Sequence, residues 1–314
     1  ADSPWPGYRA YPERLNLAQE VLKPAIERGL GNRVALISDG GSLTYEVLHA
    51  QVNALAASLI RLGLTKGDLA LIKMSNCTEF AVAFLAAVKL GVIPVLVNSL
   101  LSAGELRSVL EQAPPRLVFT QAGRADAVRE LRNEGLFEDV VCTGDAAPGE
   151  IPFASLLEQG GEGVSTADTA AAEPAFIVYT SGTTGKPKGI VHAHRWIVAL
   201  GDLNRYRLPP QENDVVMATG EWSFISALGH NLLFPLRNGV TGAILSARAT
   251  PENVLHSIDK YRVTVLHSVA TVYRRLLATT NFEKEYDLTS LRCAHSTGEA
   301  LREATYNEWK KRAG

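Results

Sequence analysis

The segment "YTSGTTGKPKG", from Tyr179 to Gly189, combines hydroxyl donors, glycines and two lysines in a short stretch. Backbone N–H groups of a glycine-rich loop, together with hydroxyl groups, can form a nest for an anion. Lysine ammonium groups add charge-assisted hydrogen bonds to phosphate oxygens, each worth about 1.5 to 3 kcal/mol. The segment is therefore predicted to bind a polyphosphate. The residues expected to take part are Thr180, Ser181, Gly182, Thr183, Thr184, Gly185, Lys186 and Lys188.

This loop differs from the phosphate loop of ordinary nucleotide hydrolases. Its "GTTGK" core has two residues between the glycines instead of four, and Pro187 stands where a Ser or Thr would hold magnesium and begin a helix. Gly182, Gly185 and Gly189 are expected to allow positive φ and close approach of the backbone. A plain glycine-rich surface turn is the alternative, but it does not account for so many hydroxyl groups and lysines together.

The elements that must position this loop alternate between strands and helices. The strand "AFIVY", from Ala175 to Tyr179, leads directly into the loop. Strands that are apolar on both faces and alternate with helices predict a mostly parallel sheet covered by helices, so the fold class is α/β. Before the loop, strands are expected at Val34, Leu69, Ile93, Arg116 and Val140, with helices from Tyr45 to Leu62, from Cys77 to Leu90, from Ala103 and near Ala125.

After the loop a second α/β series follows, with strands near Val215, Gly242, Thr264 and Leu291. The stretch from Thr143 to Glu173 is rich in Gly, Ala, Thr, Glu and Pro, and it is interpreted as a surface excursion that can mark a lobe boundary. A chain of 314 residues is long for one small core, so two lobes are expected.

Composition excludes several classes of function. The net charge is only -2 and the basic residues are scattered, so neither nucleic acid nor an anionic membrane is an expected partner. The most apolar stretch, from Phe80, is interrupted by Lys89, Gly91 and Pro94, which favours a buried helix and strand over a membrane span. The N-terminus lacks the apolar core of a signal peptide, so a cytoplasmic protein is expected.

No metal site is predicted from the spacing of cysteines or histidines. The three cysteines, Cys77, Cys142 and Cys293, are far apart and are expected to be reduced and structural. The histidines outside the motifs lack ligand spacing and form no Ser-His-Asp set, so they are interpreted as structural or surface residues. They are His49, His230 and His256.

The motifs together resemble the adenylate-forming superfamily of acyl- and aryl-CoA synthetases, luciferases and peptide-synthetase adenylation domains. "YTSGTTGKPKG" matches the superfamily's phosphate-loop signature at every position. Further matches, spread over almost the whole chain, are "LTYEVL" at Leu43, "KLGVIPVLVNSLL" at Lys89, "HAHRW" at His192 and "STGEAL" at Ser296.

The resemblance implies a two-step reaction. A carboxylic acid would attack the α-phosphate of ATP to give an acyl-adenylate and pyrophosphate, and the acyl group would then pass to coenzyme A or a carrier thiol. ATP, Mg²⁺ and coenzyme A are the implied cofactors, and Thr184 and Lys186 would hold the leaving phosphates during catalysis. The turn after the strand "LRCAHS" would line the adenine and ribose through Ser296, Thr297, Gly298, Glu299 and Ala300.

The resemblance is strongest to benzoate- and aminobenzoate-CoA ligases, which implies an aromatic or cyclic acid. Without it, Trp222 and Phe224 would be interpreted as core aromatics and His267 as a buried histidine with its hydrogen bonds satisfied. Ser226 stands where those ligases usually have an aromatic residue, and Ala270 replaces a proline, so the identity of the acid stays open. The residues implied to line the acid pocket are Trp222, Phe224, Ser226, Ala227, His267 and Ala270.

Residues 1–314 would form the major part of the superfamily's N-terminal domain, as two interleaved, doubly wound lobes at roughly 55–205 and at 1–54 with 206–314. The second acidic signature, the ribose-binding aspartate and the C-terminal domain with its catalytic lysine would follow Gly314, so the chain alone is expected to be inactive. A medium-chain acyl-CoA synthetase, a carrier-loading adenylation domain and a nucleotide-binding module without catalysis are the alternatives, and a homodimer is left open.

Overall fold

A computed structural model describes residues 11–181 and 187–313 of the chain. The chain divides into two compact units, each built around its own sheet. The first unit comprises Ala1–Pro24, His49–Met74 and Glu79–Pro209, and the second comprises Ala25–Leu48, Ser75–Thr78 and Pro210–Gly314.

The first unit contains a seven-stranded sheet in the order β7-β6-β5-β3-β4-β8-β9. All neighbouring strands are parallel except β8 and β9, which are antiparallel. Central strands such as β5 are buried along almost their whole length, as expected for a parallel sheet covered on both faces. The strands are β3 (Leu69–Lys73), β4 (Ile93–Leu96), β5 (Leu117–Gln121), β6 (Asp139–Thr143), β7 (Ile151–Pro152), β8 (Pro174–Ser181) and β9 (Pro187–Ala193).

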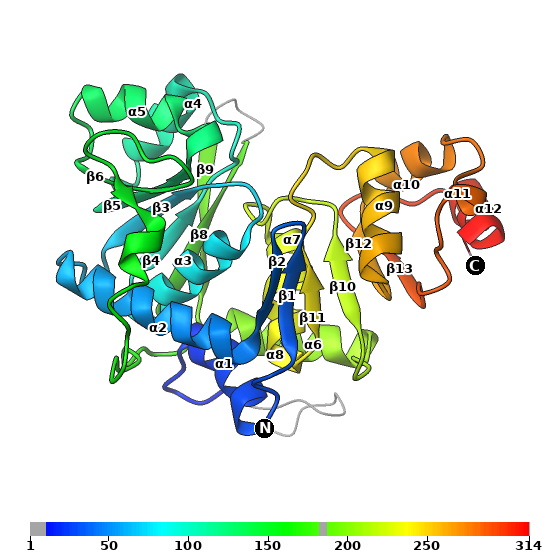
Figure 1. The fold of residues 1–314 in the computed structure, drawn as a ribbon, viewed down its shortest axis with the longest axis horizontal. Coiled ribbons are helices and arrows are strands. Elements are labelled where there is room, and N and C mark those ends of the chain that lie inside the picture. The colour runs from blue at the N-terminus through cyan, green and yellow to red at the C-terminus, as the bar shows by residue number, and fades with distance from the viewer. Residues whose placement is uncertain (1–10, 182–186, 314) are drawn as a thin grey trace. The chain divides into compact units, whose positions relative to one another are not determined.

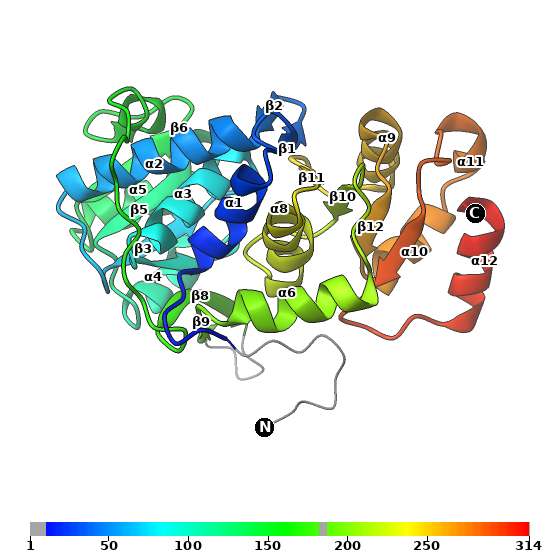
Figure 2. The ribbon, with the colours of Figure 1, turned by 90° about the horizontal axis from the view of Figure 1, so that it is seen from below.

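Helices cover both faces of this sheet (Figures 1 and 2). On one face Leu106, from the helix after β4, packs into a core with Val118 of β5 and Ile177 of β8. Strand side chains alternate in direction, so Phe176 points to the other face, where its ring lies 5.5 Å from that of Phe84. The helices are α1 (Leu17–Glu27), α2 (Tyr45–Arg61), α3 (Thr78–Lys89), α4 (Ala103–Leu110), α5 (Asp126–Asn133) and α6 (Trp196–Arg207), with short turns η1 (Ala122–Arg124) and η2 (Phe153–Leu156).

The apolar stretch from Phe80 forms the buried helix α3 followed by β4, as the sequence predicts. Phe80 to Lys89 are all buried in this helix. Within the described ranges, no helix combines the length and the apolar character needed to cross a membrane.

The second unit contains a six-stranded sheet in the order β13-β12-β10-β11-β1-β2. Only the β1–β2 pair is antiparallel. The orange helix α9 lies along this sheet (Figure 1), where Val254 and Ile258 pack with Leu266 of β12. The strands are β1 (Val34–Ser38), β2 (Gly41–Thr44), β10 (Val215–Ala218), β11 (Thr241–Ala243), β12 (Val265–Ser268) and β13 (Cys293–Ser296).

The helices of the second unit differ in regularity. After β10 the chain forms one continuous helical segment in three parts, the middle of which is a π-helix with a wider turn. Trp309 of the last helix joins the core, where its ring lies 5.0 Å from that of Tyr273. The elements are α7 (Ile225–Ala227), η3 (Leu228–Leu233), α8 (Phe234–Asn238), α9 (Pro251–Tyr261), α10 (Ala270–Leu277), α11 (Phe282–Glu285) and α12 (Glu303–Ala313).

The mixed, mostly parallel sheets flanked by helices confirm the predicted α/β fold class. The unit boundaries differ from the predicted ones in two places, because the chain up to Pro24 belongs to the first unit and Ser75–Thr78 belongs to the second. In the segment before α1, Leu15 donates its backbone N–H to the Thr169 carbonyl at 2.9 Å, and the Asn16 amide donates to the Val88 carbonyl at 3.0 Å. These bonds hold the segment against the seven-stranded sheet and its helices.

The predicted surface excursion from Thr143 to Glu173 is wrong in part. Its Ile151 and Pro152 add strand β7 to the sheet, and Phe153 is buried against the Phe119 ring, with centroids 6.3 Å apart. The first unit continues on both sides of this stretch, so it does not mark a boundary between the units. Because the stretch is rich in Gly, Pro and Thr, its composition gave no sign that Phe153 is buried.

Candidate functional site

The described residues of the phosphate-loop segment belong to the antiparallel strands β8 and β9, at the edge of the first unit's sheet. In the register of this hairpin Thr180 lies opposite Lys188, and Ser181 lies opposite Pro187. These residues were expected in the loop, but the strands extend further and contain them. Proline is tolerated there because β9 is an edge strand. Gly182, Thr183, Thr184, Gly185 and Lys186 fall outside the described residues.

Thr180 and Lys188 lie on the same face of the hairpin, because directly opposed residues of an antiparallel pair project to one side. Both side chains are exposed, and among the described residues neither has a hydrogen-bond or ion-pair partner. A hydroxyl donor and an ammonium group held side by side by backbone pairing can bind an oxyanion. The strand geometry therefore places two of the predicted ligands where a phosphate could reach them.

The lack of a side chain at Gly189 allows close packing, and the residue does not adopt a left-handed backbone conformation. It is absent from the glycines with positive φ, so the expectation of positive φ at this position is wrong. A Cβ atom added at Gly189 would lie 3.0 Å from Cζ of Tyr179 and 3.1 Å from Cγ2 of Ile177. The missing side chain lets the Tyr179 ring cross the hairpin backbone at the base of the loop.

The turn after β13 is the second predicted nucleotide contact, and it lies in the second unit. Gly298 has φ +83°, a conformation that favours glycine. Thr297 donates its backbone N–H to the Ser268 carbonyl at 3.0 Å, which fixes the turn to the end of β12. The Ser296 hydroxyl oxygen is buried and has no partner among the described residues, whereas Ala300 is exposed. The backbone of this turn is therefore positioned by β12 and β13 together.

Glu299 was expected to line the base or ribose, but its carboxylate contacts the start of α10. It accepts the Thr271 backbone N–H at 2.6 Å and the Thr271 hydroxyl at 3.0 Å. These two hydrogen bonds, the backbone one first, lower the pKa of the Glu299 carboxyl. A carboxylate at a helix N-terminus satisfies free N–H groups and the helix dipole. Its role in this structure is to hold the turn against α10.

Two of the predicted acid-pocket residues lie in the core of the second unit. Trp222 and Ala270 are both fully buried. The Trp222 indole Nε1–H donates to Oδ1 of Asn231 at 2.9 Å, and its backbone N–H donates to Oδ1 of Asn76 at 2.7 Å. In the structure Trp222 is thus a core aromatic residue. This agrees with the interpretation of Trp222 made from the residue type alone, without the family resemblance.

Of the other four acid-pocket candidates, two are exposed and two are buried. Phe224 is 51% exposed, and Ser226 is exposed beside it on α7. The Ser226 hydroxyl lies 3.1 Å from the Thr297 hydroxyl, which links this helix to the predicted adenine turn. Ala227 and His267 are buried below them. The structure therefore brings Ser226 and the turn together, although they are far apart in the sequence.

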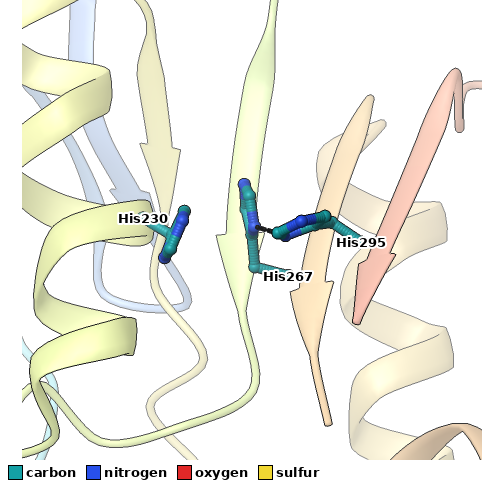
Figure 3. A group of neighbouring side chains, drawn as sticks. All are labelled: His230, His267 and His295. Carbon is teal, nitrogen blue, oxygen red and sulfur yellow. Dashed lines mark hydrogen bonds between the residues drawn. The ribbon is translucent and has the colours of Figure 1, made fainter. Parts of the chain in front are cut away.

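A cluster of three histidines was not predicted as a group. His230 of η3, His267 of β12 and His295 of β13 each place a ring nitrogen within 4.8 Å of the others (Figure 3). His230 was expected to be structural or on the surface, and only His267 was a candidate site residue. A usable signal was the repeated "HS" dipeptide at the ends of two consecutive strands, because β12 and β13 pair His267 with His295.

Burial controls the charge of this cluster. His267 is 4% exposed, and burial, followed by the nearby His230 and His295, lowers its pKa well below the ordinary value. Burial also lowers the pKa of His230. Removing an imidazolium from water is costly, so these two rings are neutral at neutral pH.

The chain belongs to the family of AMP-binding enzymes, whose profile matches residues 25–314. A benzoate–CoA ligase of Thauera aromatica is 33% identical over 306 residues, covering 96% of this chain and 58% of the ligase. The anthranilate CoA ligase AuaEII, solved in complex with anthranoyl-AMP, has a TM-score of 0.93 at 27% identity, covering 97% of this chain and 59% of that chain. A benzoate CoA ligase from Burkholderia xenovorans LB400 has a TM-score of 0.87 at 26% identity, covering 95% and 59%.

These comparisons confirm the resemblance that the motifs indicate. The chain spans a little under three fifths of the length of these relatives.

Proposed function

We propose that the chain is the larger part of the N-terminal domain of an ATP-dependent aryl-CoA ligase. The intact enzyme would join an aromatic or cyclic carboxylic acid to the α-phosphate of ATP, releasing pyrophosphate. The thiol of coenzyme A would then attack the acyl carbonyl, forming the thioester and releasing AMP. The observation that carries the proposal is the likeness of nearly the whole chain to a ligase solved with an aromatic acyl-adenylate.

The hairpin would handle the leaving phosphates. Thr180 and Lys188 supply a hydroxyl group and a positive charge on one exposed face, at the base of the segment that the resemblance assigns to the β- and γ-phosphates. Thr184 and Lys186 carry the main roles in that assignment. Positive charge that is already in place when pyrophosphate departs lowers the barrier without rearrangement.

The turn at Ser296 to Ala300 would hold the nucleotide base through backbone groups. Gly298 leaves room for a flat ligand, and the Glu299 contact with Thr271 keeps the turn in place. In this proposal Glu299 is a positioning residue and touches no ligand.

The acid would lie beside Phe224 and Ser226. Phe224 offers an exposed ring for stacking, and Ser226 offers room that an aromatic side chain would fill. Trp222 and Ala270 would support this pocket from within the core. Mg²⁺, a cytoplasmic location and a homodimer stay predictions, and no step above depends on them.

Pyrophosphate exchange by the intact protein tests this proposal. Labelled pyrophosphate should enter ATP only when an accepted acid is present, and benzoates should support faster exchange than cyclohexane carboxylates or fatty acids. Exchange with fatty acids alone would favour a medium-chain acyl-CoA synthetase. No exchange with any acid would indicate a nucleotide-binding module without catalysis. Transfer to coenzyme A or to a carrier protein then identifies the acceptor.

A further inference from the structure

Three imidazole rings from separate parts of the second unit lie next to one another (Figure 3). His230 comes from the π-helix η3, and His267 and His295 come from the adjacent parallel strands β12 and β13. Ring centroids lie 4.2 Å apart for His230 and His267, and 5.0 Å apart for His267 and His295. One ring nitrogen of each lies within 4.8 Å of the other two.

The backbone explains why the rings meet. His267 and His295 are register partners in a parallel ladder, so their side chains project from the same face of the sheet. The helical segment that contains η3 packs on this sheet, because the Asn231 amide donates to the Val216 carbonyl of β10 at 2.9 Å and to the Ala243 carbonyl of β11 at 3.0 Å. His230, the residue before Asn231, is thereby held beside His267.

A hydrogen bond shows which ring nitrogen of His230 has a lone pair available to bind a metal. Its Nδ1 lies 2.8 Å from the Ser226 backbone carbonyl. A carbonyl can only accept, so Nδ1 carries the proton and Nε2 keeps its lone pair. Histidines that bind metals commonly donate their other N–H to a backbone carbonyl, which orients the ring and sets the tautomer.

The other two rings form a pair that shares one proton. Nδ1 of His267 lies 3.0 Å from Nδ1 of His295, so one donates and the other accepts. Two nitrogens bound to one tetrahedral zinc ion, each at 2.0 to 2.1 Å, lie about 3.3 Å apart. A metal could therefore replace the shared proton with a small rotation of the rings. That proton would pass to Nε2 of the same ring, so this pair would release no net proton.

We propose that His230, His267 and His295 form a three-histidine site for a divalent transition metal, with Zn²⁺ the best match. Neutral imidazole is a preferred ligand of zinc, and three protein ligands would leave a fourth position open. The inference requires only these three side chains and does not depend on the proposed ligase activity.

Metal titration of the intact protein tests the site. The protein is prepared without a polyhistidine tag and stripped with a chelator, and then Co²⁺ is added. One equivalent should bind with the visible absorption of tetrahedral Co²⁺ on nitrogen ligands, and one equivalent of Zn²⁺ should abolish that absorption. No saturable binding, or binding with an octahedral Co²⁺ spectrum, would overturn the proposal.

Matched variants assign the ligands. His295→Gln changes an exposed residue, so the protein should fold and bind Co²⁺ at least about ten-fold more weakly. His256→Gln is the control, because His256 is an exposed histidine of α9 outside the cluster, and it should bind like the wild type. His230→Gln should behave like His295→Gln. Wild-type affinity in both cluster variants would refute the assignment.

Discussion

Nε1 of Trp222 lies 2.9 Å from Oδ1 of Asn231, and both side chains are fully buried. The Asn231 amide also donates to the carbonyls of Val216 and Ala243. One side chain thus satisfies an indole donor and two strand carbonyls in the core. Buried polar groups that lose their partner cost about 1 to 3 kcal/mol each, so this asparagine is expected to be important for stability.

The first prediction concerns Asn231. Asn231→Leu should lower the free energy of unfolding by about 3 kcal/mol or more, because it leaves the indole N–H and two carbonyl groups without partners. Asn253→Leu is the control, since its amide bonds the Arg248 carbonyl in an exposed position, and it should cost about 1 kcal/mol or less. Urea unfolding of the intact protein measures both. Equal losses would contradict the role assigned to Asn231.

The second prediction concerns the phosphate segment. Lys186→Ala or Thr184→Ala in the intact enzyme should slow adenylation ten- to a hundred-fold, which is about 1.4 to 2.8 kcal/mol of transition-state stabilisation. Pyrophosphate exchange measures the effect. Lys284→Ala, an exposed lysine of α11, should leave the rate unchanged. Unchanged rates for both loop variants would show that the segment takes no part in the reaction.

The third prediction concerns the size of the acid. If Ser226 lines the acid pocket as proposed, its small side chain would leave room that an aromatic residue would fill, so acids bulkier than benzoate should be accepted. Ser226→Phe should reduce kcat/KM for the bulkier acids by about ten- to two-hundred-fold, corresponding to about 1 to 3 kcal/mol, and should spare benzoate. Ser226→Ala keeps the space and should keep the bulkier acids. A strict preference of the wild type for unsubstituted benzoate would show that Ser226 does not line the pocket.

The fourth prediction concerns pH and His194, a buried residue of the first unit that lies within the "HAHRW" motif. Its Nδ1 accepts the Leu17 backbone N–H at 3.0 Å, and burial lowers its pKa from 6.5 to about 4. Between these values the unfolded chain binds more protons than the folded one. Stability is therefore full above about pH 6.5 and should fall by roughly 3 kcal/mol as the pH drops to about 4.

Unfolding measured across this pH range checks the expectation. His194→Asn places an amide oxygen near the position of Nδ1 without a titrating group, so it should flatten the pH dependence. His256→Asn changes an exposed histidine and should keep the wild-type slope. A slope that survives in His194→Asn would assign the pH dependence to other groups.

The sequence alone determined the elements whose signal is local. Runs such as "LALI" and "RLVFT" are apolar on both faces, and the structure confirms them as β3 and β5 to within one or two residues. The phosphate-loop signature was also readable, because its donors are contiguous in the chain. Strand β9 was missed, since "PKGIVHA" is largely exposed and carries no apolar alternation. Its strand conformation depends on pairing with β8, which is a tertiary contact.

The tertiary structure decided which distant residues meet. Apolar periodicity predicts that a strand is buried, but it specifies neither the neighbouring strand nor the register. His267 and His295 are therefore brought together only by the pairing of β12 with β13. In the same way the π-helix η3 sets His230 beside them and Asn231 beneath Trp222. The sequence therefore determined the kind of fold, and the phosphate-binding role of the loop stays a prediction from its residue types. Sheet order and helix packing determined which side chains meet around Ser226 and the three histidines, because those contacts join segments that no local pattern connects.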